Sequence, residues 1–214
     1  MRTILLTGFE PFGGEVINPS WDAVQQLDGW QPDSETRVRA IQLPCVFDVS
    51  VAVLNTQIAV LDPVLVISVG QAGGRTCFSL EKVAINYNDA RIPDNQGQQP
   101  LATATVENGP VAYFSTLPLK YLVQQLRIKD IPAELSFSAG TFVCNHVFYG
   151  LMHTLASTPE VRAGFIHIPY SPAQASRTPS PSMSTALVVE ALKICIEASL
   201  LTSEDIILAT GQLN

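Results

Sequence analysis

Short apolar runs alternate along the chain with segments in which apolar residues recur every three or four positions. The runs predict strands at residues 3–7, 37–43, 64–69, 135–139 and 164–168. The periodic segments predict helices at residues 47–60, 119–126 and 185–200, and a further helix that begins near residue 143. Asn18, Pro19 and Ser20 are typical of a helix start, and they predict one more helix reaching Leu27.

Two segments interrupt this alternation. Residues 71–109 carry many turn formers, and residues 171–184 are rich in proline and serine, so we expect loops in both, with a short strand near residues 77–86. No repeat or linker divides the sequence. Strands that alternate with helices predict a single α/β domain over residues 1–214, a three-layer α/β/α sandwich with a mostly parallel, mixed central sheet.

Charged residues make up only 14% of the 214 residues, compared with about a quarter in an average globular domain. So few charges predict that part of the surface is covered by other copies of the chain, and we expect a homo-oligomer. The net charge of −7 and the lack of a lysine or arginine cluster argue against binding to nucleic acid or to an acidic membrane. No apolar run is long enough to span a membrane.

The cysteines are scattered and show no metal-ligand spacing; they are Cys45, Cys77, Cys144 and Cys195. The apolar run at the N-terminus is too short for the core of a secretory signal. We therefore expect reduced thiols, no metal site and a cytoplasmic location.

Four loops directly follow predicted strands, at residues 8–14, 70–74, 141–145 and 167–170. In an open parallel sheet, functional residues gather beyond the carboxyl ends of the strands. We expect these loops to converge on one edge of the sheet and to hold the functional site.

Cys144 lies in one of these loops, at the opening turn of a predicted helix. Unpaired amides and the partial positive charge of a helix start favour a thiolate, so we expect a lowered pKa and a nucleophile. The alternative is a cysteine buried as a small apolar residue.

A cysteine nucleophile needs a base. His146 and His153 are predicted along the same helix, where they do not face the cysteine, whereas His167 ends a strand at the expected edge. The sequence alone does not separate a catalytic His167 from one satisfied inside the sheet.

A carboxylate must orient such a histidine, and the candidates in the loop regions are Glu10, Glu81, Asp89 and Asp94. Glu81 is flanked by apolar residues, so it is expected to be partly buried and to need a partner. The alternative partner is a cation such as Lys82 or Arg91.

Phe9, Phe12 and Phe142 lie in these loops and predict a pocket with aromatic walls, the alternative being ordinary core residues. The glycine-rich segment at residues 8–14 lacks the spacing of a phosphate-binding loop, which makes phosphate binding improbable.

Six motifs over nearly the whole chain resemble, in order and spacing, those of the pyroglutamyl peptidase I (pyrrolidone-carboxylate peptidase) family. They are Gly8-Phe-Glu-Pro-Phe-Gly-Gly14 with Asn18-Pro-Ser20, Gly70-Gln-Ala-Gly-Gly-Arg75, Glu81-Lys-Val-Ala-Ile-Asn86, Arg91-Ile-Pro-Asp-Asn-Gln-Gly97, Gly140-Thr-Phe-Val-Cys-Asn-His-Val-Phe-Tyr149 and His167-Ile-Pro-Tyr170.

The resemblance implies a cytosolic cysteine exopeptidase, often a homotetramer, that hydrolyses the amide bond after an N-terminal pyroglutamyl (5-oxoprolyl) residue through an acyl-enzyme and without a cofactor. It implies that Cys144 is the nucleophile, His167 the general base and acid, and Glu81 the orienting carboxylate. The residues that it places in or beside the substrate pocket are Phe9, Phe12, Gln71, Arg91, Phe142 and Val143.

Two other functions stay open at this point. A nucleoside phosphorylase-like enzyme on a similar scaffold would need a phosphate site, and a binding protein would keep the pocket without a reactive thiol.

Overall fold

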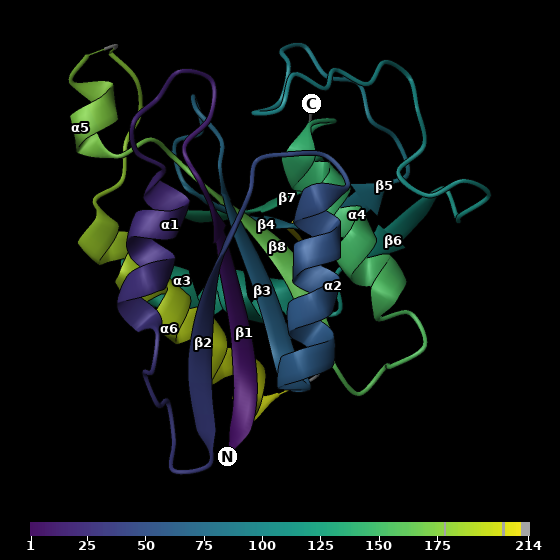
Figure 1. Cartoon of the computed structure of the whole chain (residues 1–214). Coiled ribbons are helices and arrows are strands. Elements are labelled where there is room, and N and C mark those ends of the chain that lie inside the picture. The colour runs from purple at the N-terminus through teal and green to yellow at the C-terminus, as the bar shows by residue number, and fades with distance from the viewer. Residues whose placement is uncertain (178, 203, 211–214) are drawn as a thin grey trace.

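The computed structural model describes residues 1–177, 179–202 and 204–210. Its centre is a six-stranded sheet in the order β2-β1-β3-β8-β4-β7, with a separate two-stranded sheet of β5 and β6 (Figure 1). The strands are β1 (Arg2–Phe9), β2 (Thr36–Leu43), β3 (Pro63–Gln71), β4 (Phe78–Glu81), β5 (Val83–Ile85), β6 (Ala112–Phe114), β7 (Ala133–Ser136) and β8 (Arg162–Ile168). Strands β1, β2, β3 and β8 are parallel, and β4 and β7 run in the opposite direction.

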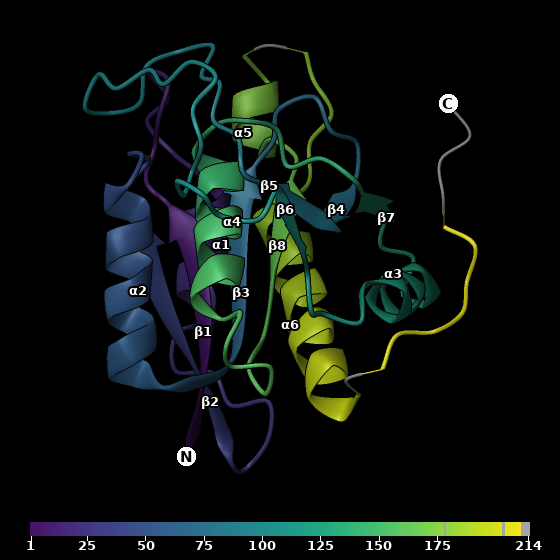
Figure 2. The ribbon, with the colours of Figure 1, turned by 90° about the vertical axis from the view of Figure 1, so that its right-hand side faces the viewer.

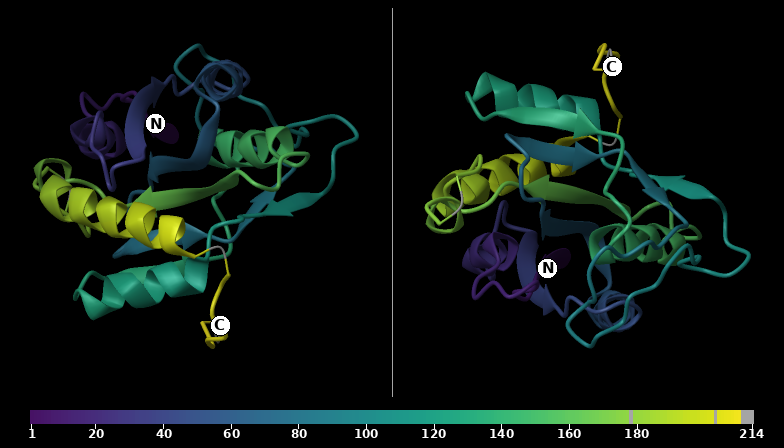
Figure 3. Two further views of the ribbon diagram at one scale, coloured as in Figure 1. Left: turned by 90° about the horizontal axis from the view of Figure 1, so that it is seen from below. Right: turned by 90° about the horizontal axis from the view of Figure 1, so that it is seen from above.

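Helices cover both faces of this sheet (Figures 2 and 3). They are α1 (Pro19–Val24) with a 3-10 turn (Gln25–Leu27), α2 (Val49–Leu61), α3 (Leu119–Ile128), α4 (Val143–Thr154), α5 (Pro172–Ala175) and α6 (Thr185–Leu201). One apolar core lies between the sheet and helices α1, α3 and α6, and the other lies between the sheet and helices α2 and α4. The predicted three-layer α/β/α sandwich with a mixed, mostly parallel sheet is confirmed.

The central strands have apolar residues on both faces because helices cover both faces. Ile4 and Leu6 of β1 contribute to one core, whereas Leu5 of the same strand contributes to the other. A single domain over residues 1–214 stays a prediction, which the sharing of one sheet by all these helices supports. Among the residues that the structure describes, no helix is both long enough and apolar enough to cross a membrane.

Two of the predicted strands have other boundaries in the structure. The strand expected at residues 77–86 is split at Lys82 into β4 and β5, because β5 leaves the main sheet and pairs with β6, which was not predicted. The strand expected at residues 135–139 is β7, which ends at Ser136, where the Ser136 hydroxyl bonds to the Ser138 backbone and forms a turn.

The segment at residues 171–184 was expected to be a loop, and Thr178 within it lies outside the described residues. It contains the short helix α5, which Ser171 and Gln174 stabilise by a reciprocal capping box. The Gln174 amide also donates to the Gln71 side chain at 3.0 Å, which ties α5 to the end of β3.

Candidate active site

A pocket of about 300 Å³ lies beyond the carboxyl ends of β3 and β8 and beside the start of α4. It is lined by Phe12, Gln71, Ala72, Arg75, Ser138, Ala139, Gly140, Thr141, Phe142, Cys144 and His167. All four loops that were expected to converge on one edge of the sheet contribute residues to this lining. The pocket therefore lies at the predicted edge of the sheet.

Cys144 is the second residue of α4, as predicted. The chain is extended at Phe142 (φ −100°, ψ −165°) and turns into the helix at Val143. The buried side chain of Asn145 holds this first turn, because its amide accepts from the Ile85 N–H (3.0 Å) and donates to the Ile85 carbonyl (2.9 Å). The amides of the first turn have no partners within the helix and lie beside the thiol.

Gly70 of β3 makes room for the thiol. A Cβ atom at this position would lie 2.8 Å from Cys144 Sγ and 2.9 Å from the Phe165 ring. Gly70 is also paired in register with His167 on the neighbouring strand β8. The thiol and the histidine are therefore packed around the same point at the end of the sheet.

The expectation of a lowered cysteine pKa is wrong. Burial raises the pKa of the Cys144 thiol well above its ordinary value, and the neighbouring Cys45 and Glu81 add to this rise, whereas Arg75 opposes it. The helix start is a local feature that a sequence reveals, but the loss of water around the sulfur outweighs it. A raised pKa favours the neutral thiol, so a base that activates Cys144 has to take its proton during the attack.

His167 and Glu81 form a buried pair. The antiparallel pairing of β8 and β4 brings the two side chains together, and His167 Nδ1 lies 2.8 Å from Glu81 Oε1. A carboxylate accepts, so Nδ1 carries the hydrogen in this contact, which leaves Nε2 of the neutral ring as the nitrogen that can accept a proton. His167 lines the pocket together with Cys144.

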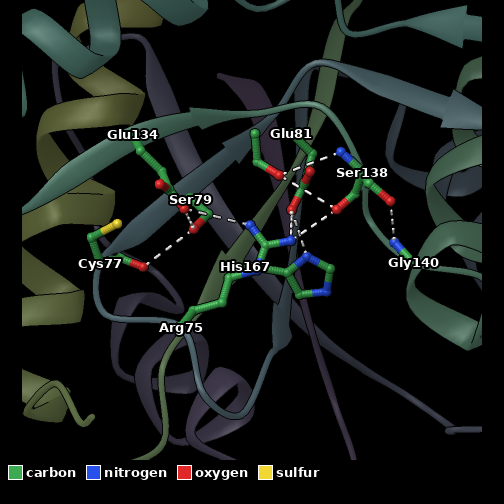
Figure 4. Close-up of polar contacts among 9 residues, drawn as sticks. Arg75, Cys77, Ser79, Glu81, Glu134, Ser138, Gly140 and His167 are labelled. Atoms are coloured by element: carbon green, nitrogen blue, oxygen red, sulfur yellow. Dashed lines mark hydrogen bonds and ion pairs between the residues drawn. The ribbon is translucent and has the colours of Figure 1, made fainter. Parts of the chain in front are cut away.

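Arg75 is the second partner of Glu81, with Nη2 3.0 Å from Glu81 Oε1 (Figure 4). From the sequence, Lys82 or Arg91 was expected as a cation for Glu81, and the pairing with Arg75 was not predicted. A signal was available, since Arg75 directly follows the glycine-rich loop at the end of β3. Lys82 instead lies over the Phe114 ring, 5.1 Å from its centroid.

Of the other candidate carboxylates, Asp89 is exposed and does not line the pocket, whereas Glu10 and Asp94 tie loops together. Glu10 accepts from the backbone N–H of Cys45 and from the Asn95 side chain. Asp94 is buried and accepts from the backbone N–H groups of Phe47, Gln96 and Gln98. Neither residue is among those that line the pocket.

His146 and His153 have the structural positions that the sequence predicted. His146 is buried, with Nδ1 3.1 Å from Asn88 Oδ1, and its Nε2 accepts the Asp48 N–H at 3.0 Å. A ring nitrogen that accepts from a backbone amide carries no hydrogen, so His146 is neutral. His153 is exposed and bonds to the Tyr113 hydroxyl at 2.9 Å.

The aromatic residues divide into two groups. Phe12 and Phe142 are half-buried and line the pocket, as does Gln71. Phe9 and Val143 are fully buried behind it, where Phe9 packs on Phe165 with centroids 6.2 Å apart. Arg91 is exposed and is not among the lining residues.

All four cysteines are free thiols. Within the described part of the chain, no group of three or more His, Cys, Asp or Glu residues could hold a metal ion.

Residues 2–202 match the sequence profile of a family described as pyroglutamyl peptidase. Pyrrolidone-carboxylate peptidases from Escherichia fergusonii and Klebsiella pneumoniae are 56% and 57% identical to this chain over 212 residues, and each match covers 99% of both sequences. The crystal structure of pyroglutamyl peptidase I from Bacillus amyloliquefaciens matches with a TM-score of 0.94 and 46% identity, over 97% of this chain and 99% of that chain. A mutant pyrrolidone carboxyl peptidase from Pyrococcus furiosus matches with a TM-score of 0.90 and 40% identity, over 94% of this chain and 99% of that chain.

Proposed function

Since the chain belongs to the pyroglutamyl peptidase family and is a hydrolase that removes N-terminal pyroglutamate, we propose that it works as a cysteine peptidase with Cys144, His167 and Glu81 as its catalytic triad. The observation that carries this proposal is that Cys144 and His167 line the same pocket, while Nδ1 of His167 is held by Glu81. Nucleophile, base and orienting group are the three parts that such a reaction requires.

The first half of the reaction forms a thioester. The Cys144 sulfur attacks the carbonyl carbon that joins pyroglutamate to the next residue, while His167 Nε2 takes the thiol proton. Because burial raises the pKa of Cys144, this proton transfer accompanies the attack. The tetrahedral intermediate then breaks its C–N bond, and the proton on Nε2 passes to the departing amine.

The second half releases pyroglutamate. A water molecule gives a proton to His167 Nε2 and forms a C–O bond to the thioester carbon. The intermediate expels the sulfur, which recovers the proton from Nε2. The role of Glu81 is to keep the hydrogen on Nδ1 and to stabilise the protonated ring.

The start of α4 is placed to stabilise the oxyanion in both halves. The amides of its first turn have no partners in the helix, and they lie beside the attacking sulfur. Arg91, which the resemblance places in or beside the pocket, is exposed and is not among the lining residues. We therefore assign the oxyanion to the backbone amides.

Phe12 and Phe142 supply the apolar surface for the lactam ring. Their centroids are 6.1 Å apart, with 39° between the ring planes. A flat ring inserted between them needs roughly 7 Å, twice the optimal contact distance, so the lactam does not fit between the two. It rests against one shared aromatic wall. An ordinary N-terminal glutamate would bring charges into this wall, at a cost of a few kcal/mol in desolvation.

Substitution of Cys144 tests the proposal. Wild type, Cys144→Ala, Cys144→Ser and the control Cys77→Ala are assayed with a pyroglutamyl naphthylamide, and thermal melting confirms that each is folded. Cys77 is a partly exposed thiol outside the pocket lining, so Cys77→Ala keeps wild-type activity. Both Cys144 variants lose at least about a thousandfold in kcat. Undiminished turnover by either would refute the assignment of the nucleophile.

We also propose that the protein is a homo-oligomer, a tetramer by resemblance to its family, in the cytoplasm. The low charge content and large apolar side chains exposed near the sheet edge, Phe114 and Phe137, support a covered surface. Light scattering after size-exclusion chromatography measures the mass directly, and a monomer at micromolar concentration would contradict the assembly.

A further inference from the structure

Arg75 connects three parts of the pocket rim. Its Nη2 atom lies 3.0 Å from Glu81 Oε1 and donates to the Ser138 carbonyl at 2.8 Å, and its Nη1 atom lies 3.7 Å from Glu134 Oε1. Figure 4 shows the guanidinium between these groups, next to the His167 ring. The Arg75 side chain is 23% exposed and lines the pocket, so it is within reach of the substrate cavity.

The two oxygens of the Glu81 carboxylate differ in their contacts. His167 Nδ1 and Arg75 Nη2 both contact Oε1, whereas Oε2 is buried and has no hydrogen-bond partner among the described residues. An arginine keeps its charge at every pH at which a protein is folded. The oxygen that orients His167 is therefore already partly neutralised by a permanent cation.

A protonated His167 would lie close to this cation. Arg75 Nη2 and His167 Nδ1 are within about 6 Å of each other, because each lies within 3.0 Å of the same oxygen. At that separation, two positive charges repel noticeably even in a partly solvated site. A histidine that is the general base must be neutral before the attack, so this repulsion favours the reactive form.

We propose that Arg75 is a positioning residue of the triad, which holds Glu81 against His167 while its fixed charge keeps the His167 imidazole neutral at working pH. The inference rests on the proposed function, and it adds a fourth residue to the three discussed above. Through the Ser138 carbonyl, the same guanidinium holds the turn that leads to α4 and Cys144. Arg75 also opposes the rise in the pKa of the Cys144 thiol, so its charge favours release of the proton that His167 takes up.

The other ionisable groups around His167 do not include a second permanent cation among the pocket-lining residues. Glu81 faces it from β4 and Cys144 faces it from α4. Cys45, in the segment after β2, is near enough to influence Cys144, but burial raises its pKa to about 12. Glu134 on β7 contacts Arg75 only at 3.7 Å and is partly exposed. Arg75 is thus the permanent cation among the groups that line the pocket.

The pH dependence of kcat/KM separates this role from a merely structural one. Arg75→Gln removes the charge, so the protonated imidazole persists to higher pH and the acid limb of the profile moves up by about one to two pH units. Arg75→Lys keeps the charge, so the acid limb of the profile stays within a few tenths of a pH unit of its wild-type position. Lysine lacks the guanidinium that contacts both Glu81 and Ser138, so kcat falls. Glu134→Gln is the matched control, and it leaves the limb in place.

A titration of His167 by NMR completes the experiment. Cys144→Ala and Cys144→Ala/Arg75→Gln are compared, with the His167 signal assigned by His167→Asn, so the result does not depend on residual activity. The proposal expects the ring to become protonated at higher pH in the double variant. Superimposable profiles and superimposable titrations would overturn the proposal for Arg75, while a Cys144→Ala variant that still turns over would instead overturn the proposed function.

Discussion

Gly70→Ala is the substitution that most directly probes the packing of the nucleophile. The new methyl group would lie 2.8 Å from Cys144 Sγ and 2.9 and 3.0 Å from two atoms of the Phe165 ring. Favourable contacts between such atoms begin near 3.5 Å, so the sulfur or the methyl has to move by about 0.7 Å. The sulfur is at the end of a short side chain with one rotatable bond and is the group most easily displaced.

This displacement sets the size of the effect. A misplacement of about 1 Å at a reacting centre lowers a rate by about a hundredfold. We therefore expect kcat/KM of Gly70→Ala to fall by about 10- to 100-fold, which corresponds to roughly 1.4 to 2.7 kcal/mol of lost transition-state stabilisation. The crowding of Phe165 adds about 1 to 3 kcal/mol of lost folding stability, which is small enough for the variant to fold.

Gly150→Ala is the matched control for overpacking. Its methyl group would lie 2.7 Å from the Val51 side chain, a similar clash on the same helix as Cys144 but away from the thiol. Overpacking at Gly150 is partly offset by the higher helix propensity of alanine, by about 1 kcal/mol. We expect kcat/KM of this variant to stay within about twofold of wild type.

The assay is the hydrolysis of a pyroglutamyl naphthylamide by both variants, together with thermal melting curves. Equal activity of Gly70→Ala and Gly150→Ala, each folded, would refute the reasoning, because it would mean that the reactive thiol does not occupy the space beside Gly70.

Two further predictions concern pH and substrate contact. Burial lowers the pKa of His146, so the unfolded state binds more protons than the folded state at low pH. The free energy of unfolding therefore falls as the pH drops below about 6.5, by up to about 1.4 kcal/mol per pH unit. In urea titrations at several pH values, His146→Gln should flatten this slope, and an unchanged slope would contradict the neutral histidine. Phe12→Ala removes part of the aromatic wall, so KM should rise by about tenfold with kcat nearly constant, and steady-state kinetics with an unchanged KM would argue against Phe12 as a substrate contact.

The sequence was sufficient for the parts of the site that follow from local pattern and fold class. A strand that ends at His167 and a helix that begins near Cys144 are both visible as periodicity, and the strand-end rule then brings them to one edge. His167 differs from His146 and His153 in the same way, since His146 is two positions beyond Cys144, where side chains do not face each other, and His153 is more than a turn from the helix start. The roles of Glu81 and of the phenylalanines, in contrast, came mostly from resemblance to a family.

The contacts that were missed depend on tertiary structure. The pairing of Arg75 with Glu81 joins a loop to a strand, and although Arg75 follows the end of a predicted strand, only the fold shows that it reaches Glu81 and Arg91 does not. The direction of the pKa shift of Cys144 was wrong for the same reason, because a helix start is local whereas burial of the sulfur results from the whole fold. Phe9 and Phe12 look equivalent in one motif, yet Phe9 ends a buried strand and Phe12 follows it in the loop.

Capture of the acyl-enzyme is the most direct test of the central claim that Cys144 carries the pyroglutamyl group during turnover. The protein is mixed with an activated pyroglutamyl ester, quenched in acid within the first turnovers, and studied by intact mass and peptide mapping. We predict a mass increase of one pyroglutamyl group, located on the peptide that contains Cys144, which disappears as the ester is consumed and is absent in Cys144→Ala. Turnover without any adduct, or an adduct on Cys45 or Cys77, would contradict the account.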